Sequence, residues 1–270
     1  MRLVEKSNWT GIGVVFNRSN IKEALGRPEI DRTGVYVLVG RPEDSALPIV
    51  YVGEGDPVRE RLKSHNSNKD FWDWCVFFVT KDNSLNKAHV QRMECRLLEL
   101  AREAKQCRLD NRNCPNPPTL SEADEADVDS FLLDMLSVLP LVGLTAFEKP
   151  QSRSIAQELL QIEAKGIRAT GYEGSSGFVV CAGSGVVGEE TPAIQPYVSA
   201  LRRDLISEGV IVSQNDSLLF SQDHIFGSPS TAAGVILGQS VSGRKRWRTQ
   251  DGTTLKELQT GDVDNNASFD

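Results

Sequence analysis

The sequence predicts an α+β protein with two small domains, the first built on a three-stranded antiparallel sheet flanked by helices. A length of 270 residues is comfortable for two domains. Short β-rich runs alternate with amphipathic helical stretches in both halves, and a proline-rich break lies near residues 113–118. We therefore predict a first domain with an N-terminal extension, a helical linker, a second small α+β domain and a disordered tail. Their ranges are 1–115, 116–165, 166–258 and 259–270.

The first domain is predicted from the order of its strands and helices. A β-rich run at residues 10–16 and a short helix at 20–25 form the extension. Aromatic and β-branched residues predict three strands, and proline after an aspartate predicts the start of the first long helix. The second long helix has an apolar stripe at helical spacing. The strands are expected at 34–39, 49–53 and 71–80, and the helices at 56–65 and 86–105.

The linker and the second domain follow from periodicity and turn residues. An acidic amphipathic helix is expected at 121–139, and a second periodic stretch at 155–164. Glycine-rich residues 171–185 have no G-K-[ST] motif, so they predict a tight hairpin followed by a strand rather than a phosphate loop. Helices are expected at 194–207 and 230–237, and Ser228 or Ser230 can cap the second of them.

Composition restricts the function classes. The net charge of −7 argues against a histone-like binder, but a nuclease needs only a local basic patch, and basic residues gather at 59–65 and 244–248. No apolar run is long enough to cross a bilayer, and the N-terminus lacks a secretory signal, so we expect a cytoplasmic protein without a membrane partner. The five cysteines include no C-x-x-C pair and are expected to be reduced.

Two tyrosines on neighbouring strands are the first candidate site residues. Tyr36 follows Gly34-Val35, and Tyr51 precedes Val52-Gly53. Because side chains alternate along a strand, valines packed inward would place both tyrosines on the outer, accessible face of the hairpin. Taken singly, either tyrosine is better explained by the preference of tyrosine for strands.

Four further polar residues follow in the same half of the chain. Arg61 and His65 lie one helical turn apart and can contact a phosphate, although a solvated basic face is the commoner explanation for one such pair. Glu94 falls inside an apolar helical stripe, so it requires a partner such as a cation unless it reaches water at the edge of the stripe. Asn111 follows the helix and could orient a loop or simply form a turn.

In combination and order, these residues resemble the GIY-YIG nuclease family over residues 30–112. Gly34-Val35-Tyr36 and Tyr51-Val52-Gly53 match the two tripeptide motifs, Glu94 matches the metal-binding glutamate, and Asn111 matches the late asparagine. Arg61 and His65 match the positions on the following helix. The separation between the tripeptides is longer than in compact members, which an enlarged loop at 41–48 explains.

The resemblance implies a mechanism of phosphodiester hydrolysis. Glu94 would hold one Mg²⁺ or Mn²⁺, and Arg61 would neutralise charge on the phosphoryl oxygens. Tyr36 would position or deprotonate the attacking water, Tyr51 would bond to that water or to the phosphate, and His65 would relay a proton. The basic helix face, with Arg59, Arg61 and Lys63, would contact the nucleic acid.

A second resemblance concerns the C-terminal half, from Phe226 to Trp247. This stretch resembles the DUF4357 domain, which often follows GIY-YIG domains. Arg244, Lys245, Arg246 and Arg248 offer phosphate contacts, and Trp247 offers either a stacking ring for a base or a core side chain within a basic hairpin. We therefore predict that this domain binds substrate.

The combined prediction is a metal-dependent DNA endonuclease, with a monomer as the expected state. The alternatives are a non-catalytic DNA-binding or adaptor protein that keeps a nuclease fold, and a nuclease for structured RNA. Fold kinship does not decide among them.

Overall fold

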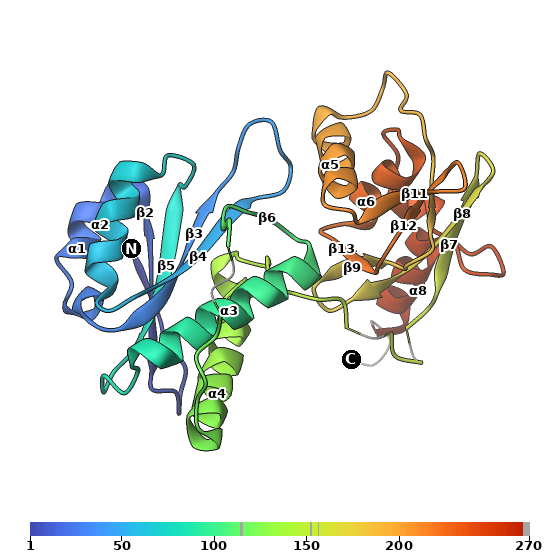
Figure 1. The fold of residues 1–270 in the computed structure, drawn as a ribbon. Helices are drawn as coiled ribbons and strands as arrows, with labels where there is room; N and C mark the ends of the chain where they lie inside the picture. The colour runs from blue at the N-terminus through green and yellow to red at the C-terminus, as the bar shows by residue number, and fades with distance from the viewer. Residues whose placement is uncertain (114–115, 152, 156, 267–270) are drawn as a thin grey trace. The chain divides into compact units, whose positions relative to one another are not determined.

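The computed structural model describes residues 1–113, 116–151, 153–155 and 157–266 and divides into two compact units. The first unit comprises Met1–Glu43 and Leu47–Glu148, and the second comprises Asp44–Ala46 and Lys149–Asp270. Figure 1 shows the path of the chain, which is a mixture of helices and strands in both units. The predicted α+β class is therefore confirmed.

The first unit is built on a six-stranded mixed sheet, where the sequence predicted three strands. The strand order is β1-β2-β5-β3-β4-β6, and all neighbours are antiparallel except the parallel pair β4 and β6. The additional strands come from the N-terminal extension and from a two-residue segment that follows the second long helix. The strands are Arg2–Val4 (β1), Gly11–Asn17 (β2), Gly34–Gly40 (β3), Ile49–Gly55 (β4), Trp74–Thr80 (β5) and Arg108–Leu109 (β6).

One face of this sheet is covered by α3 (Lys87–Ala104) and α4 (Glu122–Val138). Val35, Val37 and Val39 of β3 belong to the buried cluster on this face, as the alternation of side chains predicted. The apolar stripes of both helices complete the cluster, so burial of these stripes explains why the two helices pack here.

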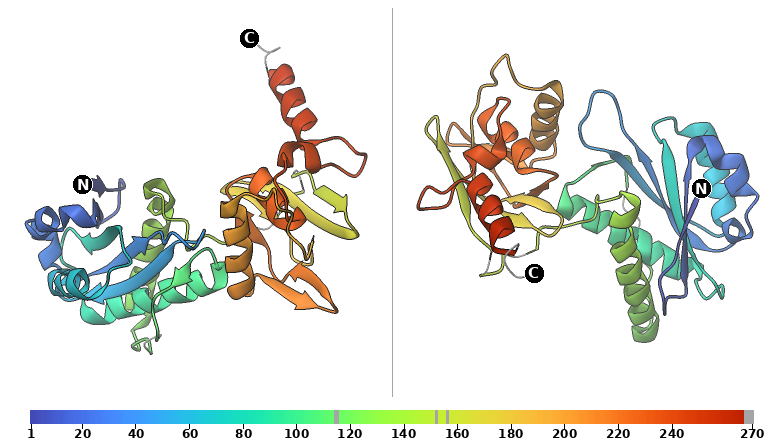
Figure 2. Two further views of the ribbon diagram at one scale, coloured as in Figure 1. Left: turned by 90° about the horizontal axis from the view of Figure 1, so that it is seen from above. Right: turned by 180° about the vertical axis from the view of Figure 1, so that it is seen from behind.

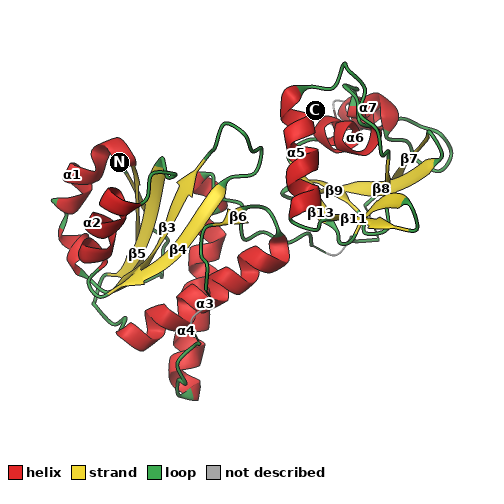
Figure 3. Cartoon of the chain, turned by 45° about the horizontal axis from the view of Figure 1, so that its top comes forward, coloured by secondary structure: helices red, strands yellow, loops and turns green. Residues whose placement is uncertain are grey.

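The opposite face is covered as well, by α1 (Ile21–Leu25), η2 (Pro28–Asp31) and α2 (Val58–Asn68) (Figure 3). Tyr36 and Leu38 are fully buried against these helices. The expectation that both tyrosines lie on an accessible face is therefore wrong for Tyr36. The reason is that the N-terminal extension and α2 supply a second apolar layer, which the pattern within one strand does not reveal.

The helix α4 belongs to the first unit, whereas the sequence placed it in a linker at 116–165. Ser121 caps it by accepting a hydrogen bond from the backbone N–H of Asp124 at 3.2 Å. Val128, Phe131 and Met135 are buried in the core shared with α3. The acidic composition of α4 suggested a solvated bridge between domains. Because its apolar stripe is buried, the helix is instead part of the first unit. Of the proline-rich break near 113–118, residues 114–115 lie outside the described range.

The second unit contains two small antiparallel sheets (Figure 2). Their orders are β10-β12-β11 and β13-β9-β8-β7. The predicted glycine-rich hairpin is present as β8 and β9, and the second half of the periodic stretch at 155–164 is a strand rather than part of a helical linker. The strands are Leu160–Ala164 (β7), Ile167–Gly174 (β8), Gly177–Val180 (β9), Gly185–Val186 (β10), Ile211–Gln214 (β11), Ser217–Phe220 (β12) and His224–Phe226 (β13).

Four helices complete the described part of this unit: α5 (Pro196–Ser207), α6 (Pro229–Leu237), α7 (Gly243–Arg246) and α8 (Leu255–Asn266). Ser228 caps α6 by accepting from the N–H of Thr231, as predicted. The helix α8 continues to Asn266, where the sequence predicted a disordered tail from residue 259, and residues 267–270 lie outside the described range. Throughout the described residues, every helix is too short or too polar to span a bilayer.

Candidate functional site

The six candidate residues of the first unit come from elements that surround β4. Tyr51 lies on β4 itself, and Tyr36 lies on the neighbouring strand β3. Both α2, which carries Arg61 and His65, and α3, which carries Glu94, pack against β4. Asn111 follows β6, the parallel neighbour of β4. The structure therefore brings together residues that are up to 75 positions apart in the sequence.

Tyr36 and His65 form the centre of an aromatic cluster. The Tyr36 hydroxyl and His65 Nε2 are 2.7 Å apart, and the ring centroids of Tyr51 and His65 are 4.9 Å apart. Tyr36 lies opposite Gly53 in the antiparallel register. A Cβ at Gly53 would lie 2.3 Å from the Tyr36 hydroxyl oxygen. The glycine of the second tripeptide thus leaves the space that the Tyr36 ring occupies.

Burial controls the protonation of this pair. Desolvation raises the pKa of Tyr36 well above its usual value, although the guanidinium of Arg61 opposes the shift. Desolvation, together with the charges of Arg61 and Lys69, lowers the pKa of His65 to about 4. His65 is therefore neutral at pH 7, and one of its ring nitrogens can accept a proton.

Arg61 and Glu94 provide opposite charges in the same site. Arg61 is exposed, and the proximity of Tyr36 raises the pKa of its guanidinium. Glu94 is half-buried, and desolvation together with the charge of Glu54 raises its pKa to about 7. Arg61 and Lys87 act on Glu94 in the opposite direction. A carboxylate perturbed in this way beside a pocket is a candidate functional group.

A pocket of about 570 Å³ opens beside Tyr51 and Glu94. Lys69 lines it and was not predicted as a site residue. Its ammonium group lies 4.1 Å from the centroid of the Tyr51 ring and pairs with Asp110. Lys69 is four residues after His65 and eight after Arg61, so helical spacing could have identified it. The lining residues are Tyr51, Asn68, Lys69, Asp70, Phe71, Glu94, Asp110, Asn111, Arg112 and Asn113.

Two further charged residues were also missed by the sequence analysis. Glu54 follows the second tripeptide, and both of its carboxylate oxygens accept hydrogen bonds from Lys87 Nζ at 2.7 Å. Lys87 lies two helical turns before Glu94 on α3, which places the two residues on one face. This spacing, and the position of Glu54 directly after Gly53, could have identified both residues.

Asn111 uses its whole amide group to hold β4. Its Oδ1 accepts from the N–H of Val52 at 2.9 Å, and its Nδ2 donates to the carbonyl oxygen of Val52 at 2.8 Å. The strand β6 pairs with Ile49 and Val50 of β4, and Asn111 extends the pairing by one step toward Gly53. It is a positioning residue for the strand that carries Tyr51.

The other basic residues predicted on α2 have partners within the protein. Arg59 forms an ion pair with Asp31 and also donates to the carbonyl oxygen of Leu25. Lys63 pairs with Glu60 at 3.0 Å on the helix surface. Of the three cations predicted to contact nucleic acid here, Arg61 is directed toward the tyrosine cluster, and the other two form local pairs.

The fit of a divalent cation is determined by the available carboxylates. Over the described residues, no group of three or more His, Cys, Asp and Glu side chains is arranged to hold a metal. Glu94 and the neighbouring Glu54 are hard oxygen donors of the kind that Mg²⁺ prefers, and Mg²⁺ usually keeps several water ligands. Because both oxygens of Glu54 already accept from Lys87, the residues present fit a cation bound by Glu94 and by water or phosphate oxygens.

The basic segment of the second unit presents exposed cations around a buried tryptophan. Arg244, Lys245, Arg246 and Arg248 are exposed. Trp247 is fully buried, packs on Phe178 with ring centroids 4.6 Å apart and donates its indole N–H to the carbonyl oxygen of Pro229. Of the two alternatives for Trp247, a stacking ring for a base and a core side chain, the burial supports the core side chain.

Comparison with known proteins identifies a family for this second unit alone. Residues 160–259 match the family model described as a domain of unknown function, DUF4357. This part of the chain is a DUF4357 domain, as the resemblance predicted, and it spans all strands and helices from β7 to the first turns of α8. No curated protein and no solved structure matches the chain.

Proposed function

We propose that the first unit is a GIY-YIG-type nuclease domain and that the protein is a metal-dependent DNA endonuclease. The observation that supports the proposal is the gathering of both motif tyrosines, His65, Arg61 and Glu94 around β4. Each has a chemistry that phosphodiester hydrolysis uses, and burial and charge shift the pKa values of Tyr36, His65 and Glu94 in one region.

Glu94 would hold the Mg²⁺ or Mn²⁺ ion, and Glu54 lies close enough to influence its charge. The cation would supply Lewis-acid polarisation of the scissile phosphate. Arg61 is exposed and can form charge-assisted hydrogen bonds with non-bridging oxygens. Lys69, which lines the pocket, adds a second positive charge near the same strand of the nucleic acid.

The tyrosines would have separate tasks. Tyr51 lines the pocket and can orient a water molecule or a phosphate oxygen there. The raised pKa of Tyr36 keeps its hydroxyl protonated at pH 7, so Tyr36 can take a proton from the attacking water only by passing its own hydroxyl proton to an acceptor. The neutral ring of His65, 2.7 Å from the Tyr36 hydroxyl, provides one.

One observation favours the alternative of a non-catalytic DNA-binding or adaptor protein. Tyr36 has no exposed surface, so a substrate-bound water reaches its hydroxyl only if neighbouring side chains move. A scaffold that keeps the nuclease fold for binding would tolerate such burial. A nuclease for structured RNA would use the same residues as a DNA nuclease.

The test is cleavage of supercoiled plasmid with Mg²⁺, Mn²⁺ or EDTA, using the wild type and Glu94→Ala. We expect metal-dependent nicking by the wild type and none by the variant. The matched control is Glu99→Ala, because Glu99 lies on the same helix and pairs locally with Arg96. Tyr36→Phe, which removes only the hydroxyl, is expected to lower the nicking rate by about 10²- to 10⁴-fold if that group takes part in proton transfer.

Three outcomes distinguish the candidates. DNA cleavage that survives in Glu94→Ala would contradict the assigned metal ligand. Binding of DNA by the folded wild type, with no cutting in either metal, would support the adaptor. Cleavage of a structured RNA but not of DNA would replace the proposed substrate.

A further inference from the structure

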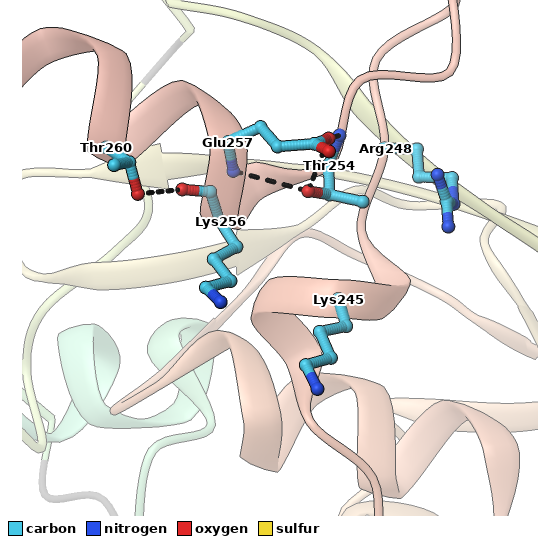
Figure 4. Close-up of a pocket in the computed structure, with 6 residues that line it drawn as sticks. All are labelled: Lys245, Arg248, Thr254, Lys256, Glu257 and Thr260. Atoms are coloured by element: carbon cyan, nitrogen blue, oxygen red, sulfur yellow. Dashed lines mark hydrogen bonds between the residues drawn. The ribbon is translucent and has the colours of Figure 1, made fainter.

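Two neighbouring pockets lie along the basic segment of the DUF4357 domain. The larger, of about 590 Å³, is drawn in Figure 4, and its lining includes Lys245 from α7, Lys256 from α8 and Arg248 between them. The smaller, of about 200 Å³, is also lined by Lys245 and Arg248 and adds Arg246. These shared residues make the two pockets parts of one continuous basic surface, defined here by Lys245, Arg246, Arg248 and Lys256.

A rigid frame positions this basic surface. The buried Trp247 anchors the segment, and its carbonyl oxygen accepts from the N–H of Leu255 at 2.9 Å, which ties α7 to the start of α8. The backbone of Arg248 exchanges two hydrogen bonds with Gln161 of β7. The cations therefore project from a packed core rather than from a free loop, so little backbone order has to be gained on binding.

The lining of the two pockets contains two carboxylates as well as the cations. Glu257, in the larger pocket, accepts hydrogen bonds from the backbone and hydroxyl of Thr254 (Figure 4), and Glu163, in the smaller, lies 3.5 Å from Arg168. Among the residues that the structure describes, no ion pair within 4 Å is found for Lys245, Arg248 or Lys256. Arg248 also donates to the carbonyl oxygen of Gly252 at 2.8 Å, and the hydrogen bonds from Thr254 together with the charges of Arg248 and Lys256 lower the pKa of Glu257. The four cations of the surface outnumber the two carboxylates, so positive charge remains for an anion from outside.

We infer that Lys245, Arg248 and Lys256 form a binding site for the phosphate backbone of a nucleic acid. A single free phosphate would occupy one pocket. Two pockets that share Lys245 and Arg248 instead suit successive phosphates of a strand, with Arg246 beside the second. Since Trp247 is buried, the surface offers no stacking ring, so binding depends on the backbone and tolerates different base sequences.

The inference goes beyond the cleavage site and is independent of catalysis. Lys256 was not among the residues predicted from the sequence, because it lies outside the basic cluster at 244–248 and meets it only through the packing of α8. The surface would serve an endonuclease and a non-catalytic binder equally, so its test must not require cutting.

The experiment measures the binding of a fluorescein-labelled DNA duplex to the full chain by fluorescence anisotropy, in EDTA and in the Glu94→Ala background. Lys245→Ala, Arg248→Ala and Lys256→Ala are each compared with the parent from 50 to 300 mM salt. If a variant neutralises one phosphate fewer, the slope of log K against log salt should fall by about 0.9, which corresponds to about eightfold weaker binding at 0.1 M salt.

The matched control is Arg203→Ala, since Arg203 is an exposed arginine of the same unit that lines neither pocket. We expect its binding to equal that of the parent, and we expect Lys245→Arg and Lys256→Arg to restore binding. Inorganic phosphate at millimolar concentration should compete weakly. Unchanged binding in all three alanine variants, or an equal loss in Arg203→Ala, would overturn the inference. Melting temperatures equal to that of the parent show that the variants are folded.

Discussion

His65 links the candidate chemistry to the stability of the first unit. The unfolded chain takes up a proton at His65 near pH 6.5, whereas the folded protein does so only near pH 4. The unfolded state therefore binds more protons in this window, and the free energy of unfolding falls as the pH is lowered from about 6.5 to about 4. The contribution of His65 to this fall is about 3 kcal/mol.

We predict that His65→Gln removes this part of the pH dependence. The difference in unfolding free energy between wild type and variant should be constant above pH 7. Between pH 7 and pH 4.5 the wild type should lose about 2–3 kcal/mol more unfolding free energy than the variant. Urea unfolding between pH 4.5 and 8 measures it. A difference that stays the same over the whole range would show that His65 titrates normally in the folded state.

Gly53 is required by the ring of Tyr36. In Gly53→Ala the new methyl group would meet the Tyr36 hydroxyl and ring, which lie at 2.3 and 2.4 Å from the ideal Cβ position. We expect a loss of about 1–3 kcal/mol in unfolding free energy, together with loss of any nicking activity, because the Tyr36–His65 hydrogen bond is displaced. Gly188→Ala is the control, since a Cβ there has no neighbour within 4 Å.

At the scale of elements, β4 depends on a side chain for part of its pairing. Asn111→Ala would leave the N–H and the carbonyl oxygen of Val52 without these partners, at a cost of about 1–3 kcal/mol. We predict a lower melting temperature as well as lower plasmid nicking. If nicking falls while the melting temperature is unchanged, Asn111 acts in the chemistry rather than by positioning the strand.

At the scale of the whole molecule, the boundary of the first unit lies after Glu148, because α4 completes its core. We predict that a fragment ending at residue 148 unfolds cooperatively, whereas a fragment ending at residue 115 exposes the apolar face of α3 and aggregates. Thermal unfolding and size-exclusion chromatography of the two fragments measure this. If the two fragments behave alike, α4 is not needed for the first unit, and the helical linker predicted from the sequence is supported.

Local patterns were sufficient for part of the secondary structure and for the six candidate residues around β4. The stripe of α3, the cap at Ser121 and the alternation of Val35, Tyr36 and Val37 each depend on neighbours within a few positions, so the sequence alone reveals them. The DUF4357 resemblance was likewise carried by a continuous stretch that includes Trp247.

Only the tertiary structure decided which of these groups are buried and which of them meet. Tyr36 is covered by helices outside its own strand, Trp247 is covered by its own domain, and Lys256 reaches the basic surface through the packing of α8. The three-stranded sheet became six-stranded because β1, β2 and β6 gain their partners from other parts of the chain. Burial and electrostatic interaction depend on distances in space, and periodicity along one element contains no information about the layer that covers it.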